Sequence, residues 1–328
     1  CTNPCGEQPL LPNESCNLGS VNLSKMLVFN DGNVEIDFEK LRKTVRSAVH
    51  FLDNVIDASK YPLSKTEEMT KSNRKIGLGV MGFAQMLIEL EIAYDSKEAL
   101  ATAEKVMKFI SDEARKKSVE IGKDRGSFSN FKGSVWEKKG YKTMRNASIT
   151  TIAPTGTISI IANTVSGIEP LFAVSFFRRV MEGTRLLEVN PAFERIAKRG
   201  GFYNKELLKK IARTGSIRDI KEIPKKVQSI FATAMDISPE WHVKMQAKFQ
   251  KHVDSAVSKT VNLPNDASID DVKRIYMMAY KLNCKGITVY RYGSKREQVL
   301  YIGTVSEGEG VEVGSESVGS CPGDVCPF

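Results

Sequence analysis

Two cysteines and a glutamate near the start of the chain are of the types that carry out thiol and acid–base chemistry. The segment Asn3-Pro4-Cys5-Gly6-Glu7 places a thiol two residues from a carboxylate across a glycine, and Cys16 follows eleven positions after Cys5. Because side chains alternate along extended backbone, we expect Asn3, Cys5 and Glu7 to face the same way. That arrangement suits a cysteine acting on one substrate atom while the carboxylate accepts a proton from its neighbour. From these three residues alone, however, a cysteine in a tight turn beside a solvated glutamate is the preferred interpretation.

A second segment with chemical potential begins where a short β-branched run ends. It contains Pro154, Thr155, Gly156 and Thr157, and Ser159 follows. Backbone N–H groups at such a helix start, assisted by hydroxyl groups and the helix dipole, can bind an anion. Without other information, an ordinary capped helix is the preferred interpretation of this pattern.

The end of the chain carries a third pattern. From about residue 303 the composition changes to Gly, Ser, Glu and Val, and near its end Cys321 and Cys326 stand with four residues between them. This composition predicts a flexible tail, and a thiol pair on such a tether is typical of a redox shuttle. Half of a zinc site and two ordinary surface thiols are the alternatives, but no second Cys or His pair lies nearby to complete a zinc site. We therefore expect no metal site.

The N-terminal pattern extends well beyond three residues. Residues 3–10 and 15–23 together closely resemble the active-site loop of the catalytic subunit of adenosylcobalamin-dependent ribonucleotide reductases. By this resemblance, Cys5 forms the thiyl radical that removes the 3′ hydrogen of the ribose, Glu7 deprotonates the 3′ hydroxyl, and Asn3 hydrogen-bonds the sugar. Cys16 becomes one half of the dithiol that reduces the 2′ position. The compact Pro-Cys-Gly-Glu form also resembles the cobalamin type more than the type with a separate di-iron radical subunit.

The resemblance extends to the other two patterns. Similar enzymes hold the substrate phosphates in a Pro-Thr-Gly-Thr turn, which implies this role for Pro154, Thr155, Gly156, Thr157 and Ser159. Related enzymes also use C-terminal cysteines to re-reduce the active-site disulfide, which implies a shuttle role for the tail pair.

The resemblance further implies an α/β fold, the second half of a ten-stranded α/β barrel with the finger loop at its N-terminus. Residues 1–302 would form this part of the barrel domain and residues 303–328 the flexible tail. Expected partners are a ribonucleotide, most simply a diphosphate, the missing N-terminal half of the same enzyme, and a thioredoxin- or glutaredoxin-like reductant. The sequence does not decide whether the protein forms a homodimer. The first residue is Cys1 and not Met, which we interpret as the mark of a fragment or of a processed or spliced product.

Composition narrows the remaining alternatives. The chain has 328 residues, of which 41% are hydrophobic and 27% charged, as expected of a folded protein. No run approaches the roughly 18 apolar residues that cross a membrane, and six cysteines are too few for a disulfide scaffold, so we expect a cytoplasmic protein. A net charge of +9, spread along helices, is most simply interpreted as solvated helix faces, and such a surface also attracts phosphorylated molecules. Nucleic acid is not an expected partner. A nucleotide- or nucleic-acid-binding module would leave Cys5 without a function, and a thiol oxidoreductase using the tail cysteines would leave residues 3–7 unexplained.

The elements that must position these residues follow from periodicity. Apolar residues at helical spacing predict amphipathic helices over 36–59 and 96–121, and a further helix is expected over 79–90. Although residues 77–82 fit the dinucleotide pattern Gly-x-Gly-x-x-Gly, no strand is expected before them, so we reject that interpretation. Strands separated by helices predict an α/β core. Strands are expected over 148–153, 173–181, 255–263 and 287–291, and the later helices over 191–199, 205–213, 225–235, 239–250 and 269–282.

Overall fold

The computed structural model describes residues 1–30, 33–179 and 185–294, and the tail expected over residues 303–328 lies outside these ranges. The strands are β1 (Asn17–Asn22), β2 (Leu27–Asn30), β3 (Asn33–Ile36), β4 (Ile76–Met81), β5 (Ser175–Arg179), β6 (Arg185–Val189), β7 (Thr260–Leu263) and β8 (Thr288–Arg291). The helices are α1 (Phe38–Ala58), α2 (Ser64–Asn73), α3 (Phe83–Glu89), α4 (Lys97–Arg125), α5 (Val135–Lys138), α6 (Gly156–Ile161), α7 (Pro191–Arg199), α8 (Lys205–Thr214), α9 (Lys225–Ile230), α10 (Pro239–Gln250) and α11 (Ile269–Lys281), with 3₁₀ turns η1 (Leu23–Lys25) and η2 (Ser129–Phe131).

Parallel strands form the centre of the structure. β1 pairs with β4 along its whole length, and β7 pairs with β8. Between these pairs runs the segment 148–153, which bridges β4 in parallel at Leu78↔Thr150 and the segment before β7 at Ile152↔Val257. The order is therefore β1, β4, 148–153, 257–263 and β8, all parallel. An α/β half-barrel is thus confirmed, although the strand expected over 148–153 forms only isolated bridges in this position.

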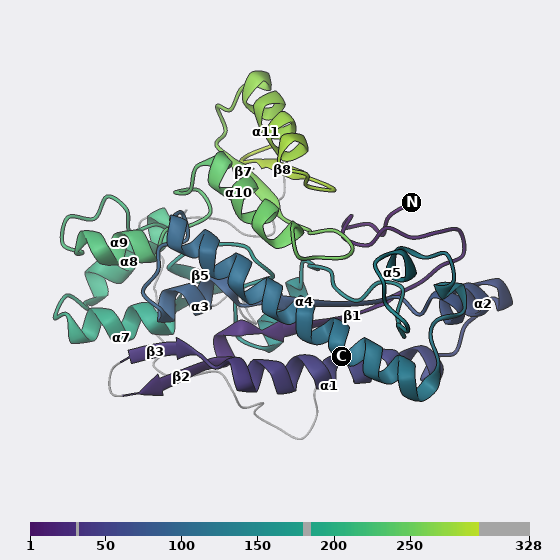
Figure 1. Cartoon of the computed structure of the whole chain (residues 1–328). Coiled ribbons are helices and arrows are strands. Elements are labelled where there is room, and N and C mark those ends of the chain that lie inside the picture. Colours follow the sequence, from purple (N-terminus) through teal and green to yellow (C-terminus); the bar gives the residue numbers. More distant parts are fainter. Residues whose placement is uncertain (31–32, 180–184, 295–328) are drawn as a thin grey trace.

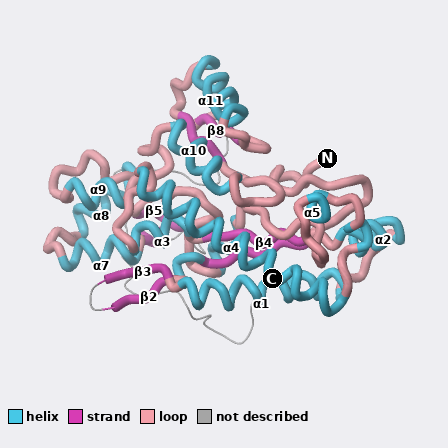
Figure 2. Tube along the Cα trace, in the orientation of Figure 1, coloured by secondary structure: helices cyan, strands magenta, loops and turns pink. Residues whose placement is uncertain are grey.

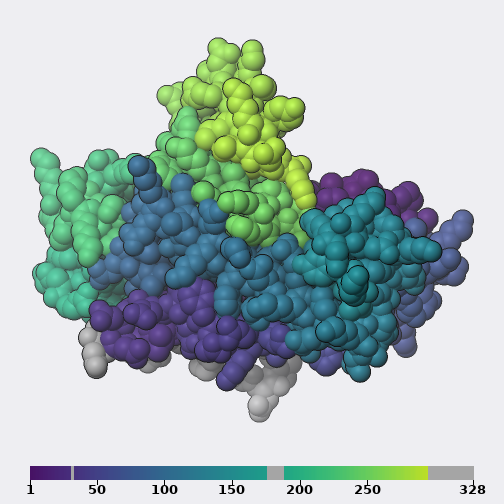
Figure 3. All heavy atoms as spheres, in the orientation of Figure 1, coloured from purple at the N-terminus to yellow at the C-terminus, as the bar shows by residue number. Residues whose placement is uncertain are grey.

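Helices α1, α4 and α10 cover one face of these strands (Figures 1 and 2). Helix α1 starts at Asp37, whose side chain accepts from the Lys40 N–H, and its apolar stripe is 3% exposed or less. The stripe consists of Leu41, Val45, Val49, Leu52 and Ile56. The large core that contains it also takes in β1, β4 and α4. Helices α7, α8 and α9 build a second core, and α10, β7 and α11 a third, smaller one that projects from the body in Figure 3.

The prediction of a helix over residues 79–90 was wrong for the first half of that range. Residues 76–81 are the fully buried strand β4, and only 83–89 are helical. Its glycines serve close packing. A Cβ on Gly79 would lie 2.2 Å from the Thr151 carbonyl oxygen, and one on Gly77 would lie 2.4 Å from Leu18 Cδ2. Strands β1 to β3 also precede residue 148, where only helices were expected, and helix α2 was missed.

Most later elements agree with the sequence prediction, but strand β6, which pairs antiparallel with β5, was missed. Helices α7 and α10 have the expected bounds, while α9 ends at Ile230, five residues early. The strand expected over 255–263 is regular only from Thr260. Within the residues that the structure describes, no helix is long and apolar enough to span a bilayer.

Candidate active site on the N-terminal loop

Residues 1–10 form a hairpin-like loop whose tip carries Cys5. Thr2 and Pro9 make an antiparallel bridge, and the Gly6 N–H donates to the Asn3 carbonyl oxygen at 3.0 Å to close the turn. Gly6 has φ +80°, a conformation that favours glycine. A Cβ added at Gly6 would meet no atom within 4 Å, so the backbone conformation and not crowding selects glycine here. The Cys5 thiol is exposed at this tip. A group approaching from outside the loop can therefore reach it.

The expected alternation of side chains along the loop was wrong. The Asn3–Gly6 turn interrupts the extended backbone, so Cys5 is exposed whereas Glu7 is 1% exposed. The Asn3 side-chain oxygen accepts from the Gln8 N–H at 3.1 Å and so braces the turn from within. The thiol and the carboxylate consequently lie in different environments, the first accessible and the second desolvated.

Glu7 is fixed by its backbone, while its side chain is left unsatisfied. Its carbonyl oxygen accepts from the Thr151 hydroxyl at 2.8 Å and from the Ala256 N–H at 2.7 Å. These two donors come from adjacent parallel segments of the half-barrel. The carboxylate atom Oε2 is buried without a hydrogen-bond partner among the described residues. A buried carboxylate oxygen without a donor is costly, so it fits a site that is completed by a hydroxyl-bearing ligand or by another part of the protein.

Cys16 lies immediately before β1 in an electrostatic environment that keeps it protonated. Burial and the nearby Glu7 carboxylate raise the pKa of the Cys16 thiol to about 12, and Lys75 opposes this shift. Its Sγ lies 3.5 Å from the Asn17 carbonyl oxygen, to which it donates. A thiol that keeps its proton at neutral pH is suited to donating hydrogen and poorly suited to acting as a free nucleophile.

Residues that no motif singled out hold the base of the loop. The Glu14 carboxylate accepts from Lys75 Nζ at 2.6 Å, from Asn73 Nδ2 at 2.6 Å and from the Leu11 N–H at 2.8 Å. Lys75 also donates to the Pro9 carbonyl oxygen at 3.2 Å. The Glu14 side chain is fully buried. Nothing in the sequence pairs residues that are 61 positions apart, so this anchor had no local signal.

The turn expected to bind phosphate lies at the end of the segment 148–153, which also carries Thr151. The Thr155 hydroxyl oxygen accepts from the Gly167 N–H at 2.7 Å, and the Ser159 hydroxyl, 2% exposed, donates to the Gly156 carbonyl oxygen at 3.1 Å. These two hydroxyl groups stabilise the turn itself. Gly156 and Thr157 are exposed at the start of α6.

The structure describes two further free cysteines, Cys1 and Cys284. Cys321 and Cys326 lie outside the described residues. Cys284 packs beside the third core, and burial raises the pKa of its thiol to about 11. The part of the chain that the structure describes contains no group of three or more His, Cys, Asp or Glu side chains placed to hold a metal ion.

Comparisons with known proteins agree with this architecture. The family model "Ribonucleotide reductase, barrel domain" matches residues 1–143 and 137–290. The chain is 57% identical over 303 residues to the vitamin B12-dependent ribonucleoside-diphosphate reductase of Thermoplasma acidophilum, covering 92% of this chain and 39% of that protein. It is 49% identical over 327 residues to the protein of the same name from Mycobacterium tuberculosis (strain CDC 1551 / Oshkosh), covering 100% of this chain and 46% of that one.

A solved structure has the same fold. The class Id ribonucleotide reductase alpha subunit of Actinobacillus ureae superposes with a TM-score of 0.72 at 24% identity, over 89% of this chain and 53% of that chain. The chain thus spans less than half the length of the two curated relatives that it matches.

Proposed function

This chain belongs to the ribonucleotide reductase family, and we propose that it is the C-terminal part of the catalytic subunit of a vitamin B12-dependent ribonucleoside-diphosphate reductase. The observation that carries the proposal is the loop itself. It presents Cys5 to the outside, buries the unpartnered Glu7 carboxylate, and places a protonated Cys16 near that carboxylate.

Each residue of the loop carries out a different step of the proposed reaction. The Cys5 thiyl radical takes the 3′ hydrogen atom of the ribose, and Glu7 accepts the proton of the 3′ hydroxyl group. Asn3 hydrogen-bonds the sugar. Cys16 and a second thiol from the preceding half supply two electrons and two protons, so that the 2′ hydroxyl leaves as water and the two sulfurs form a disulfide. Cys5 then returns its hydrogen atom to the 3′ carbon.

The cofactor of this reaction is adenosylcobalamin, as the names of the relatives and the compact loop support. The exposed Cys5 thiol fits a radical source that approaches from outside the loop, because no side chain needs to move to uncover it. When bound, the cofactor supplies the radical that oxidises the Cys5 thiol. The donor set of this chain does not need to hold the cobalt, which a corrin ring carries.

The substrate phosphates bind at the start of α6. The N–H groups of Gly156 and Thr157 provide the donors, and Pro154, Thr155 and Ser159 give the turn its shape. Because this turn directly follows the segment that anchors Glu7 through Thr151, a substrate held there has its ribose within reach of the loop.

Domain organisation and partners follow from this assignment. Residues 1–302 form the second half of the barrel, and the preceding half of the polypeptide completes it. Residues 303–328 form the tail whose Cys321 and Cys326 pass electrons from a thioredoxin-type reductant to the active-site disulfide. We place the enzyme in the cytoplasm, where such a reductant operates, and a homodimer is compatible with it.

The test of this function is Cys5→Ala in the complete enzyme, with Cys284→Ala as the matched control. We expect Cys5→Ala to abolish nucleotide reduction while nucleotide binding stays within about twofold, because only one exposed thiol is lost. Cys284→Ala keeps its turnover, since that thiol packs beside the third core. Deoxynucleotide formation is measured by chromatography and binding by equilibrium dialysis. Substantial turnover by Cys5→Ala would refute the assignment.

A further inference from the structure

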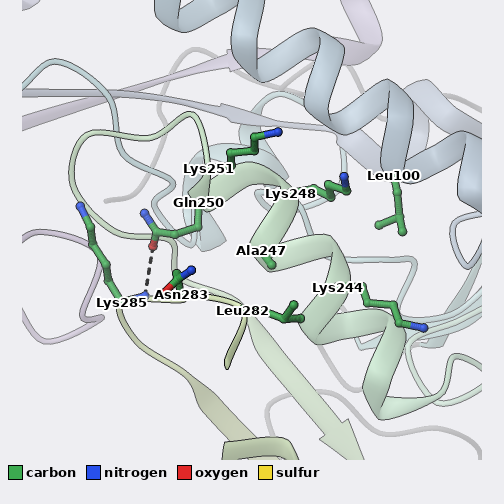
Figure 4. A pocket seen from close by; sticks show the side chains of 9 residues that line it. All are labelled: Leu100, Lys244, Ala247, Lys248, Gln250, Lys251, Leu282, Asn283 and Lys285. Atoms are coloured by element: carbon green, nitrogen blue, oxygen red, sulfur yellow. Dashed lines mark hydrogen bonds between the residues drawn. The ribbon is translucent and has the colours of Figure 1, made fainter. Parts of the chain in front are cut away.

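A basic groove lies on the outer side of the half-barrel, apart from the N-terminal loop. It is a cavity of 490 Å³ between α10, α4 and the end of α11 (Figure 4). Its floor is apolar, and four lysines surround it. The residues that line it are Leu100, Lys244, Ala247, Lys248, Gln250, Lys251, Leu282, Asn283 and Lys285.

The positive charge of this groove is only partly neutralised. Lys248 and Lys251 share a single carboxylate, that of Glu104, which Lys248 Nζ contacts at 2.7 Å. Lys244 lies over the Trp241 ring, 4.6 Å from its centroid. Lys285 donates to the carbonyl oxygens of Asp254 and Ser255 at 2.6 and 2.8 Å. Within the described residues, the four lysines face the shared Glu104 carboxylate, with Glu240 near Lys244 and Asp254 near Lys285 as further acidic groups. The cations outnumber these carboxylates, which leaves the groove attractive to anions.

The tail of the same chain has the opposite charge. Residues 303–328 contain five acidic side chains and no Lys or Arg, so residues 1–302 carry a net charge of +14 when the chain as a whole has +9. Four of the acidic residues are concentrated between Glu307 and Glu316. The described chain reaches Ser294, just after β8. Thirteen residues from there to Glu307 span at most about 45 Å, enough to return to α10.

The groove shares a backbone segment with the active-site loop. Lys285 and Gln250 both bond the Ser255 carbonyl oxygen, at 2.8 and 3.0 Å. The next residue, Ala256, donates its N–H to the Glu7 carbonyl oxygen at 2.7 Å. A peptide held in the groove therefore lies beside the strand segment that positions the loop. Cys321 follows Glu316 by five residues, at most about 17 Å of chain.

We propose that this basic groove is the docking site of the acidic tail segment 307–316, and that docking keeps Cys321 and Cys326 close to the active-site loop. The proposal rests on the shuttle role of the tail proposed above. Docking raises the effective concentration of the cysteine pair at the loop without any contact to the catalytic residues. Because the attraction is between charges at a surface, salt weakens it.

A direct test is carbodiimide coupling, which joins carboxylates to amines only where they touch. In the complete enzyme under reducing conditions, we expect peptide mapping by mass spectrometry to find tail glutamates joined to Lys244 at low salt. The same products should fall at least about fivefold in 0.5 M NaCl. Tail glutamates that couple as often to Lys139, which lies over another tryptophan ring outside the groove, or that do not couple, would overturn the proposal.

Turnover gives the second test, with Lys244→Glu and the matched control Lys139→Glu. We expect Lys244→Glu to lower turnover with a thioredoxin-type reductant about three- to tenfold at low salt, and to leave turnover with dithiothreitol unchanged. Lys139→Glu leaves both unchanged. A loss with dithiothreitol as well would mean that Lys244 supports the fold, which contradicts docking.

Two further variants separate docking from its premise. If Lys244→Glu weakens binding of the thioredoxin-type reductant to the enzyme that lacks residues 303–328, the groove binds the reductant itself and the proposal fails. If Cys321→Ser with Cys326→Ser blocks turnover by the protein reductant while Lys244→Glu does not, the shuttle stands and only docking fails. If that double variant has full turnover, the shuttle fails first.

Discussion

The protonation of Cys16 provides a quantitative test of the site. Burial and the Glu7 carboxylate raise its pKa from 9.0, the value of a free thiol, to about 12. Each unit lowers the thiolate fraction at a given pH about tenfold, so at pH 8 we expect about a thousandfold less thiolate than in an unfolded chain. Since only the thiolate is alkylated and a thiolate of higher pKa is intrinsically more nucleophilic, the reaction of Cys16 with iodoacetamide should be slowed by roughly ten- to a hundredfold.

The shape of the pH profile separates this electrostatic effect from simple shielding. Shielding lowers the rate at every pH, whereas a raised pKa moves the point at which the rate levels off. We expect alkylation of Cys16, followed by mass spectrometry of its peptide, to keep rising above pH 9. Cys284, whose pKa burial raises to about 11, should level off earlier than Cys16. In denaturant both should level off near pH 9.

Two substitutions test the causes of the shift. Glu7→Gln removes the negative charge that raises the pKa of Cys16, so alkylation at pH 8 should become faster. Lys75→Met removes the charge that opposes it, so alkylation should become slower. A rate that levels off near pH 9 in the folded chain, or substitutions that act in the opposite directions, would refute this account of the site.

Three further perturbations test the fold and the tail. Arg74→Met removes the 2.9 Å partner of the fully buried Asp53 carboxylate, which keeps Arg145 at 3.2 Å and Asn146 at 3.0 Å, so we expect the free energy of unfolding in urea to fall by about 2 kcal/mol. Gly79→Ala forces a Cβ to 2.2 Å from the Thr151 carbonyl oxygen and should cost about 1–3 kcal/mol, whereas Gly286→Ala, with open space around it, should cost little. Changing Cys321 and Cys326 together to Ser should lower turnover with a protein reductant but not with dithiothreitol, because the small reductant enters unaided; equal losses would exclude a shuttle.

Helical periodicity predicted the outer layer of this fold better than its centre. Helices α1 and α4 are buried on one face only, so their apolar residues recur at helical spacing and were found from the sequence. Strand β4 is buried on both faces, and its sequence Ile-Gly-Leu-Gly-Val-Met has no alternation to report. The same run also fits helix and dinucleotide patterns. What identifies it as a strand is the close approach of its glycines to the segment 148–153, which is a tertiary contact.

The site shows the same division between local and distant information. The loop motif pointed to Cys5, Glu7 and Cys16 because these residues are close in the sequence. Glu14 and Lys75 were missed because their ion pair forms only after α1 and α2 bring the start of β4 back beside the loop. A single sequence contains no signal for such a contact, although both residues affect the pKa of Cys16.

The turn at Gly6 also explains how the loop separates Cys5 from Glu7. Side chains alternate with a period of two only along extended backbone. Gly6, one residue after Cys5, has φ +80° and is not extended. The turn leaves the thiol outside, while the Thr151 and Ala256 donors draw the Glu7 backbone onto the strands. The proposed radical carrier needs access to the radical source, whereas a carboxylate that meets the sugar is best shielded from water. A strictly extended loop would have placed both groups in one environment. The glycine turn therefore allows one five-residue segment to provide two environments, one exposed and one buried.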